Sequence, residues 1–433
     1  MEEQIEKGFF EFIDAADAEK VHSQTIGWMF SENCKAFSYT NKYLILNELI
    51  GKNAEVQVTP ETKVYVEIND IDIMIEGEDW IIVIENKIKS SQHSNQLFKY
   101  EFLTKYDDKE ALPCFLKWKS INFNDSPDKA FENLNLEEKK HFQDTKRLNK
   151  KNKKVFYCYL TLTKEKPESS IWDNKTYSDL YKILDKFIKP DESAKDTLIV
   201  NEYLKSIKNL TNALDYMVND EDVRKWVFEH GDYTKQKVYE DEHFKNYSPK
   251  IKYIASTGLV RFMQKYYYTK FCEIFGDLNS IINWNGINLR CKVGSSASNG
   301  SGLAQIYFPD STFKFGTHEF VFGYQISGNT IKFNCAAIDY QKSNYNQLPP
   351  GIEDKFKDTL DNLKNNPSCF SKLQRKVNDS AKEKGKAYIS LTKNYNKKAK
   401  KLIEMTPREL FQFIDNELPI LHNYAIKIKK SYD

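Results

Sequence analysis

The sequence has 433 residues, of which 40% are hydrophobic and 14% aromatic, and it carries a formal net charge of +2. This length suggests two or three domains of about 100–200 residues each, and the composition excludes a disordered or collagen-like chain. The near-zero charge excludes a uniform polycation that coats nucleic acid, but it says nothing about how charge is distributed along the chain.

Segments for targeting and the spacing of cysteines and histidines narrow the class of protein further. No stretch approaches the ~18–20 uninterrupted apolar residues of a membrane span, and the acidic start MEEQIEKGFFEFIDAADAEK lacks the cationic and apolar parts of a secretory signal. We therefore expect a cytoplasmic protein. The seven cysteines are scattered without a CxxC pair, and the seven histidines show no HxH or HExxH spacing. Neither a disulfide framework nor a zinc site is expected.

The first half of the chain alternates helical and strand patterns. The apolar run from Trp80 to Ile84 is typical of a buried central strand, and Gly77-Glu78-Asp79 before it reads as a turn. The hydrophobic periodicity predicts helices over 8–31, 39–50, 94–106 and 177–188, and strands over 63–68, 71–75, 80–84 and 155–162. A polar insertion at about 107–154 interrupts this series.

The second half has a different pattern. Helical periodicity over 196–230 is followed by a polar, poorly periodic stretch at 232–249, so we expect domains at 1–235 and 236–433. After a helix near 250–276, short strands are predicted over 287–293, 303–309, 318–326 and 330–338, and the C-terminal residues return to Lys-rich helical patterns. We expect an α+β domain here.

Charged residues converge at the end of the apolar strand. A turn at Gly77 that pairs position 72 with position 85 would set Asp72 opposite Glu85, and Asp70 opposite Lys87. Two carboxylates beside an ammonium suit Mg²⁺, which prefers oxygen ligands. A cation there can polarise a phosphoryl oxygen and lower the pKa of a bound water, so the pattern indicates hydrolysis of a phosphodiester.

Asp72, followed 13 residues later by Glu85-Asn86-Lys87, resembles the D…(D/E)xK signature of the PD-(D/E)XK nuclease superfamily. The resemblance implies a restriction-endonuclease-like α/β core, in which helices flank a mixed sheet. It also implies that Asp72 and Glu85 bind a metal ion, Mg²⁺ or its substitute Mn²⁺, with the main-chain carbonyl of Asn86 as a third ligand. Lys87 would assist the attacking water. The resemblance covers roughly residues 15–190, with the insertion unmatched.

Two further segments are similar to motifs of this superfamily. Gln96-Leu-Phe-Lys-Tyr100 resembles its QxxxY motif, and on a helix Gln96 and Tyr100 lie on one face. Glu19, near the start of an apolar helix, is a candidate accessory ligand, and Glu67 competes for that role. Asp70 is an alternative first ligand; we prefer Asp72 because it lies within the strand. His22 is expected to be a packed histidine, and His93 to be exposed to solvent.

Basic residues are concentrated in two segments. Residues 145–154 contain six Lys or Arg and no acid, and residues 371–401 carry a net charge of +9, which leaves −13 for the rest of the chain. Such runs are commonly solvated helix faces, but in a candidate nuclease they favour contacts with phosphates. Tyr388 and Tyr395 in the second run are candidates for stacking on bases or for burial in a core.

These observations predict a Mg²⁺-dependent nuclease that acts on nucleic acid, with DNA favoured over RNA. From the resemblance we also expect a homodimer and a role in defence against foreign DNA. The alternatives are a catalytically inactive or partner-activated nucleic-acid-binding module of the same fold, and an RNA-directed or toxin-like nuclease. The C-terminal domain would recognise substrate or partner.

Overall fold

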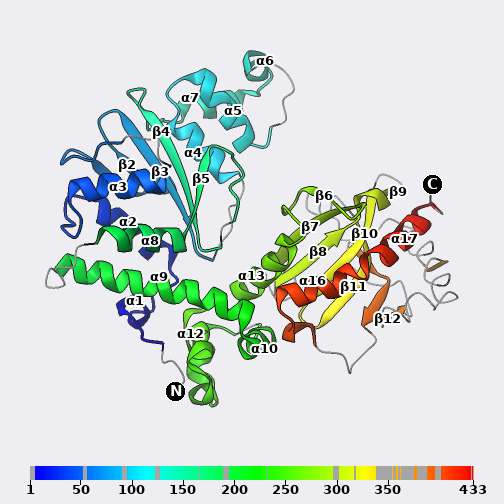
Figure 1. Ribbon diagram of the computed structural model, residues 1–433. Coiled ribbons are helices and arrows are strands. Elements are labelled where there is room, and N and C mark those ends of the chain that lie inside the picture. The colour runs from blue at the N-terminus through cyan, green and yellow to red at the C-terminus, as the bar shows by residue number, and fades with distance from the viewer. Residues whose placement is uncertain are drawn as a thin grey trace. The chain divides into compact units, whose positions relative to one another are not determined.

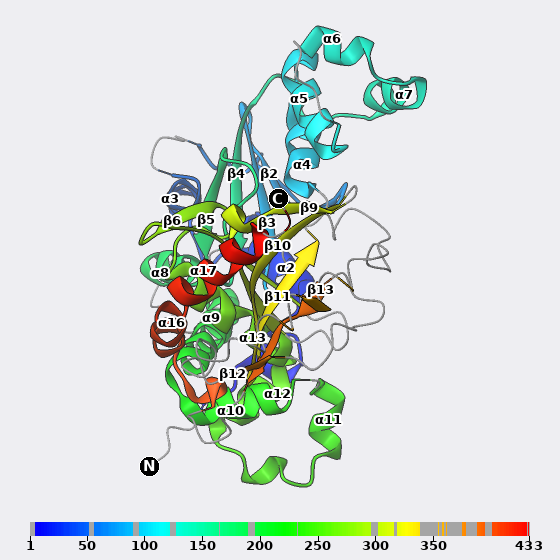
Figure 2. The same cartoon turned by 90° about the vertical axis from the view of Figure 1, so that its right-hand side faces the viewer.

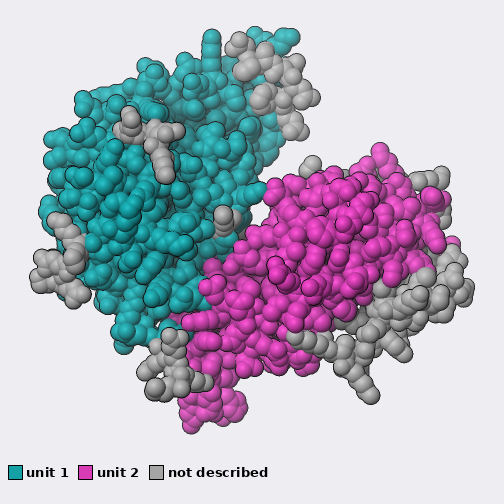
Figure 3. All heavy atoms as spheres, in the orientation of Figure 1, with its two compact units in different colours: residues 1–212 teal, residues 213–433 magenta. Residues whose placement is uncertain are grey.

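The structure is a computed structural model of the chain. It describes residues 5–51, 56–89, 95–121, 127–163, 165–188, 195–231, 233–295, 302–315, 318–337, 354, 357–358, 361, 375–377, 388–394, 401–430 and 432. The chain forms two compact units, residues 1–212 and 213–433 (Figure 3). The division falls inside helix α9 (Lys195–Asn219), earlier than the expected domain boundary after residue 235, which stays a prediction.

Unit 1 is built on a mixed five-stranded sheet with the order β1-β2-β3-β4-β5 (Figure 1). The β1, β2 and β3 strands pair antiparallel, whereas β4 runs parallel to both β3 and β5. Every residue of β3 is buried, as expected for a central strand covered on both faces. The strands are β1 (Lys63–Ile68), β2 (Ile71–Glu76), β3 (Trp80–Lys87), β4 (Lys154–Thr161) and β5 (Trp172–Thr176).

Helices cover both faces of this sheet, with α2, α3 and α8 on one side (Figure 1). The α2 helix lies close to β1, because a Cβ added at Gly27 would come within 2.6 Å of a Val66 methyl carbon. The α8 helix begins with a capping box between Thr176 and Asp179. The helices on this side and before it are α1 (Phe9–Phe12), α2 (Glu19–Phe30), α3 (Tyr39–Leu49) and α8 (Tyr177–Phe187).

The opposite face is covered by α4 and by the predicted polar insertion, which folds into three helices. Figure 2 shows α4 to α7 grouped together. Rings of Phe102 on α4 and of Phe115, Trp118 and Phe142 in the insertion pack on one another with centroids 5.2–5.8 Å apart. The helices are α4 (Gln96–Thr104), α5 (Asp108–Trp118), α6 (Pro127–Glu132) and α7 (Leu136–Asp144).

Unit 2 contains an antiparallel sheet with the order β13-β11-β10-β8-β7-β6, and β9 pairs with β10. Its strands are β6 (Ile281–Trp284), β7 (Ile287–Ser295), β8 (Gly302–Tyr307), β9 (Phe313–Phe315), β10 (His318–Ser327), β11 (Thr330–Ala337) and β13 (Tyr388–Ser390); β12 (Arg375–Val377) pairs with β14 (Thr392–Asn394). Its helices are α10 (Glu221–Glu229), α11 (Lys235–Glu240), α12 (Pro249–Thr257), α13 (Val260–Glu273), α16 (Pro407–Asp415) and α17 (Leu418–Lys429).

Most predicted elements are confirmed, and the differences have local causes. Three predicted helices are each split: 8–31 around Asp14, which has a φ of 58°; 196–230 at the N-cap Asp220; and 250–276 at Gly258, which has a φ of 68°. The prediction of helix was wrong for 375–377, 388–390 and 392–394, which are short strands. Strands β5 and β6 were not predicted, because WDNKT and IINW are short and partly polar.

Two absences concern the described residues only. The six cysteines among them are buried and free, and Cys369 lies outside the described residues. None of the helices in the described ranges is both long and apolar enough to cross a membrane.

Candidate active site

The β2–β3 hairpin has the predicted turn. The Gly77 N–H donates to the Trp80 carbonyl at 3.0 Å, and a Cβ at Gly77 would lie 2.2 Å from the Trp80 indole, so a larger residue cannot replace this glycine without moving the ring. The register pairs Ile73 with Ile84. Continued by one residue, this register sets Asp72 opposite Glu85, as the sequence predicted.

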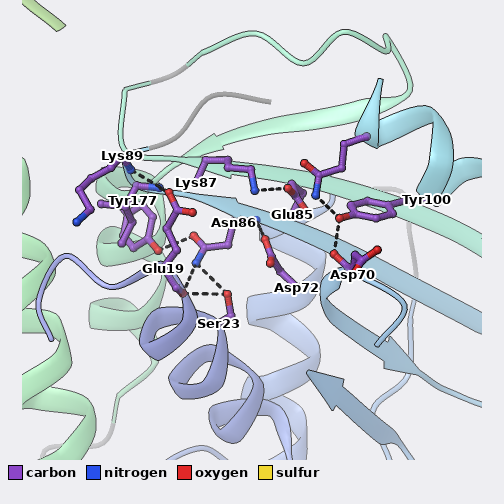
Figure 4. A network of polar contacts seen from close by, with 12 residues as sticks. Glu19, Ser23, Asp70, Asp72, Glu85, Asn86, Lys87, Lys89, Tyr100 and Tyr177 are labelled. Atoms are coloured by element: carbon purple, nitrogen blue, oxygen red, sulfur yellow. Dashed lines mark hydrogen bonds and ion pairs between the residues drawn. The ribbon is translucent and has the colours of Figure 1, made fainter. Parts of the chain in front are cut away.

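Asp72, Glu85 and Lys87 come together at the end of the hairpin (Figure 4). Lys87 Nζ lies 2.5 Å from Glu85 Oε1, and both side chains are largely buried, with 9% and 0% of their side-chain surfaces exposed. Asp72 Oδ2 accepts a hydrogen bond from the Asn86 N–H at 2.7 Å. The main chain of β3 therefore fixes the first carboxylate beside the second.

The surroundings of Glu85 oppose its negative charge. Burial, followed by the nearby Asp72 charge, raises the pKa of Glu85 to about 8, although Lys87 acts in the opposite direction. Burial also raises the pKa of Asp72. Burial works against the charge of Lys87, but the Glu85 and Asp72 carboxylates outweigh it and raise the pKa of Lys87.

The raised pKa of Glu85 favours a protonated Glu85, whereas the raised pKa of Lys87 depends on an ionised Glu85 beside it. The two directions therefore disagree about the protonation of Glu85. The pKa of Glu85 is raised because its side chain is fully buried, and burial together with the Asp72 charge outweighs the Lys87 ammonium 2.5 Å away.

The Glu85 and Asp72 carboxylates fit a hard cation. Two buried carboxylates that share one ammonium are unfavourable unless a further cation reaches them, and Mg²⁺ takes oxygen ligands while it keeps several waters. A third oxygen is at hand, because the N–H and C=O of one strand residue point the same way. The Asn86 carbonyl thus faces the Asp72 side of β3. Among the described residues no group of three or more His, Cys, Asp or Glu forms a complete protein cage for a metal.

Asn86 is anchored on the reverse face of β3. Its side-chain amide donates to the Glu19 carbonyl and to Ser23 Oγ, both at 3.1 Å, and its Oδ1 accepts from the Tyr177 hydroxyl at 2.6 Å (Figure 4). The Asn86 and Tyr177 side chains are fully buried. Side chains from α2 and α8 therefore hold the residue whose main chain binds Asp72.

The same buried layer includes His22, which is a packed histidine, as the sequence indicated. Its Nδ1 lies 3.0 Å from the Tyr203 hydroxyl and its Nε2 lies 2.8 Å from the Ala16 carbonyl. Burial lowers the pKa of His22 to about 4. His22 is therefore neutral at neutral pH and is not a proton donor to the site.

Glu19 lies beyond Lys87, at the end of β3. Its Oε1 accepts hydrogen bonds from the N–H groups of Ile88 and Lys89 at 2.9 and 3.0 Å (Figure 4). Lys89 in turn lies 2.5 Å from the buried Asp17. In this structure Glu19 fixes the main chain that leaves the site, and a role as accessory ligand stays a prediction.

Gln96 and Tyr100 share one face of α4, as the sequence predicted. The Gln96 amide donates to the Tyr100 hydroxyl, which donates to the main-chain carbonyl of Asp70 (Figure 4). Gln96 and Tyr100 thus hold in place the β1–β2 turn, which precedes Asp72 in the chain.

The expected pairing of Asp70 with Lys87 is wrong. Asn69 and Asp70 have φ angles of 50° and 68° and connect the pair Ile68–Ile71, so Asp70 belongs to a two-residue turn and not to β2. Its carboxylate is 75% exposed and pairs with Lys99. Asp72 alone of these two acids lies beside Glu85.

Glu67, the competing accessory acid, is exposed and has a φ of 59°. The β1–β2 register between the pairs Val66–Ile73 and Ile68–Ile71 sets Glu67 opposite Asp72. Its charge contributes to the raised pKa of Asp72. Glu67 therefore lies at the edge of the site.

The basic run 145–154 lies at the other end of the sheet. Lys154 pairs with Trp80, the first residue of β3, and Lys153 Nζ contacts the Gly77 carbonyl at 2.6 Å. Seven strand steps, about 23 Å, separate Trp80 from Lys87. The structure thus does not bring this run together with Asp72 and Glu85. His93, Tyr395 and most of the run 371–401 lie outside the described residues, as does the side chain of Tyr388.

Ser23 and Tyr177 were not predicted from the sequence. No sequence motif links either residue to Asn86, because the contacts form only when α2 and α8 pack against β3. The only signal was the capping box at Thr176, which fixes where α8 begins and hence where Tyr177 lies.

Comparison with known proteins gives one match. A family model described as the PD-(D/E)XK nuclease superfamily matches residues 7–253, which is more than half of the chain. The search of curated proteins and the search of solved structures each found no match.

Proposed function

Because the chain belongs to the PD-(D/E)XK nuclease superfamily, we propose that it is a metal-dependent nuclease whose catalytic residues are Asp72, Glu85 and Lys87. One observation carries this proposal. The Glu85 carboxylate is fully buried beside a second carboxylate, Asp72, and the Lys87 ammonium lies 2.5 Å from it. A purely structural buried acid pairs with one cation, whereas here two carboxylates share the charge of one ammonium.

Three oxygen donors of the chain fit a divalent cation. Asp72 and Glu85 would hold Mg²⁺, or Mn²⁺ in its place, through their carboxylates, and Asn86 through its main-chain carbonyl. When bound, such a cation polarises a phosphoryl oxygen and lowers the pKa of water. Glu85 gives up its proton when it becomes a ligand, because carboxylates bind metals in their ionised form.

Lys87 acts on the reacting groups. Its ammonium donates a hydrogen bond to the attacking water and stabilises negative charge on the phosphate as that charge develops. The water oxygen bonds to phosphorus and releases one proton to solvent, while the bond from phosphorus to the leaving oxygen breaks and that oxygen takes a proton from solvent. Burial and the contact with Glu85 hold the Lys87 ammonium beside the two carboxylates.

The remaining predicted residues position these groups. Gln96 and Tyr100 hold the turn before Asp72, and Glu19 holds the main chain after Lys87. We assign them to positioning, with Glu19 also a candidate accessory ligand.

The resemblance extends the proposal to substrate and setting. We propose DNA ahead of RNA as substrate, a homodimer as the acting form, a role in defence against foreign DNA, and a C-terminal domain that recognises substrate. The substrate, the homodimer, the defence role and the role of the C-terminal domain are inferred from the family resemblance and not from a contact in the site.

A cleavage assay tests the proposal. Full-length protein is incubated with labelled DNA and with RNA of the same sequence, in Mg²⁺, in Mn²⁺ and in EDTA. We expect cleavage only with metal, and its loss in Asp72→Asn. The matched control is Asp79→Asn, which removes an exposed acid from the turn of the same hairpin. Equal cleavage by Asp72→Asn and the parent would refute the assigned site, and binding without cleavage under every condition would support the inactive module.

A further inference from the structure

The sheet of unit 2 has two different faces. Along β7, Leu289 and Cys291 are fully buried, and Cys291 hydrogen-bonds with Cys272 of α13 on that face. Arg290 and Lys292 alternate with them and point to the other face, where both are only partly buried. Strands β7, β8, β10 and β11 lie side by side (Figure 1).

Arg290 and Lys292 each begin a row of four residues that face one another across strands β7, β8, β10 and β11. Arg290 pairs with Tyr307, which pairs with Gly323, which pairs with Asn334. Lys292 pairs with Gln305, Gln325 and Lys332 in the same way. The eight positions hold three cations, four polar or aromatic residues, one glycine and no carboxylate: Arg290, Tyr307, Gly323, Asn334, Lys292, Gln305, Gln325 and Lys332.

The charge on β7 is uncompensated within the described part of the chain. Arg290 Nε is buried without a hydrogen-bond partner, and neither Arg290 nor Lys292 takes part in an ion pair there. Burial, with the neighbouring Arg290 charge added, lowers the pKa of Lys292. Two like charges held together and partly removed from water are unfavourable unless an anion joins them.

We propose that this face, defined by the two rows from Arg290 and Lys292, binds the phosphodiester backbone of a nucleic acid strand. The inference rests on the proposed function in one respect, namely that the strand is the substrate of the nuclease. It assigns to unit 2 a binding surface of its own, on residues distant in sequence from Asp72 and Glu85.

The length of the Lys292 row favours a polymer over a single anion. Gln305 and Gln325 stand one and two strand spacings from Lys292, about 5 and 10 Å, so the row extends beyond the reach of one phosphate. Successive phosphates of a strand can contact it along its length. Arg290 offers its guanidinium charge, and Gln305 and Gln325 offer amides.

Binding is measured by fluorescence anisotropy, with the full-length Lys87→Ala protein as the cleavage-deficient parent. The probes are a labelled single-stranded DNA, an RNA of the same sequence and the DNA duplex. In this background Arg290→Ala/Lys292→Ala should bind at least about tenfold more weakly than the parent. The slope of log K against log salt should fall by about 1–2, because two phosphate contacts are lost. The three probes show which nucleic acid supplies the phosphates.

Lys245→Ala/Lys314→Ala is the matched control. It removes two cations from exposed positions of the same unit, and it should bind as the parent does. Arg290→Lys/Lys292→Arg keeps both charges and should restore most of the affinity. A merely structural pair would not show this dependence on charge and salt. Without nucleic acid, Arg290→Ala/Lys292→Ala should melt no lower than the parent, because the change removes repulsion.

Three results would overturn the proposal: the Arg290→Ala/Lys292→Ala variant binds as tightly as the parent, the control loses as much affinity, or polyglutamate competes for the face as well as nucleic acid does. Failure of the proposed function is separately visible. If the wild-type chain cleaves nothing while the Arg290→Ala/Lys292→Ala change still abolishes binding, the binding face stands and the nuclease assignment falls.

Discussion

Glu85 is the residue whose chemistry depends most on its surroundings. Its pKa lies at about 8 in the folded protein against an ordinary 4.5, chiefly because it is buried. Between these values the folded protein keeps a proton that the unfolded chain has released. The contribution of Glu85 to stability is therefore present below about pH 4.5 and is lost as the pH rises through about 8.

This difference predicts a pH effect that Glu85→Gln removes. In EDTA, the melting temperature of the parent should fall relative to that of Glu85→Gln as the pH rises from about 5 to about 9. A divalent metal should cancel the fall, because it binds the ionised carboxylate. Thermal melts at a series of pH values measure both effects. Parallel curves for the two proteins would show that Glu85 titrates as an ordinary exposed acid.

The anchoring of Asn86 gives a second prediction at this scale. Tyr177→Phe leaves Asn86 Oδ1 buried without its donor, which should cost about 1–3 kcal/mol in the free energy of unfolding. It should also weaken Mn²⁺ binding, measured by calorimetry, because the Asn86 main chain positions Asp72. Tyr157→Phe is the control, since its buried hydroxyl contacts Thr104 at 2.8 Å. It should lose stability alone, and an equal loss of metal affinity in both variants would argue against a specific role for Tyr177.

At the residue scale, the sequence predicted the positions of side chains that follow from strand alternation within one hairpin. Asp72 faces Glu85 because both strands alternate and the turn at Gly77 fixes the register. Ser23 and Tyr177 could not be predicted, because they reach Asn86 through the packing of α2 and α8, which no spacing in the sequence encodes.

At the scale of elements, the β1–β2 turn separates two acids that look equivalent in the sequence. Asn69-Asp70 forms a turn with both φ angles positive, and Asn-Gly is favoured in such turns. Asp70→Gly should therefore leave the stability unchanged or higher and should keep cleavage, because the Asp70 carboxylate is 75% exposed and pairs with Lys99 outside the site. Denaturant unfolding and the cleavage assay measure both. Loss of cleavage as complete as in Asp72→Asn would make Asp70 the first ligand instead.

The buried strands were predicted well because their apolar runs are short and bounded by turn residues, as in β3 and β4. Elements whose sequences mix polar and apolar residues were not predicted well. The insertion reads as polar, yet α5 and α7 bury Phe115 and Phe142 against Phe102, since one apolar side of each helix suffices for packing. The edge strand β5 is polar and joins the sheet through its parallel pairing with β4.

At the scale of the whole molecule, charge is distributed by segment. The net charge of +2 combines two basic runs with an acidic remainder. The structure adds that the run 145–154 leads into β4 at the end of the sheet away from Lys87, and that the paired cations of unit 2 stand on β7. Neither placement could be read from charge counts, because both depend on strand order.

Lys150→Glu/Lys151→Glu tests the consequence for catalysis. Both side chains are exposed, and about 23 Å along β3 exceeds two Debye lengths at 0.1 M salt. The rate of cleavage at saturating substrate should change by less than about twofold, although affinity at low salt should weaken. Steady-state kinetics at two salt concentrations separate these quantities. A large fall in the saturated rate would mean that this run reaches the reacting phosphate.

The most direct test of the account concerns Lys87, to which we assign a catalytic role and no part in holding the metal. Lys87→Ala should lower the single-turnover rate of cleavage by at least about a hundredfold, while Mn²⁺ and nucleic acid still bind. Lys99→Ala is the control, because it removes a nearby lysine whose partner Asp70 is exposed, and it should cleave like the parent. Cleavage by Lys87→Ala at the rate of the parent would contradict the assignment of this site as the nuclease centre.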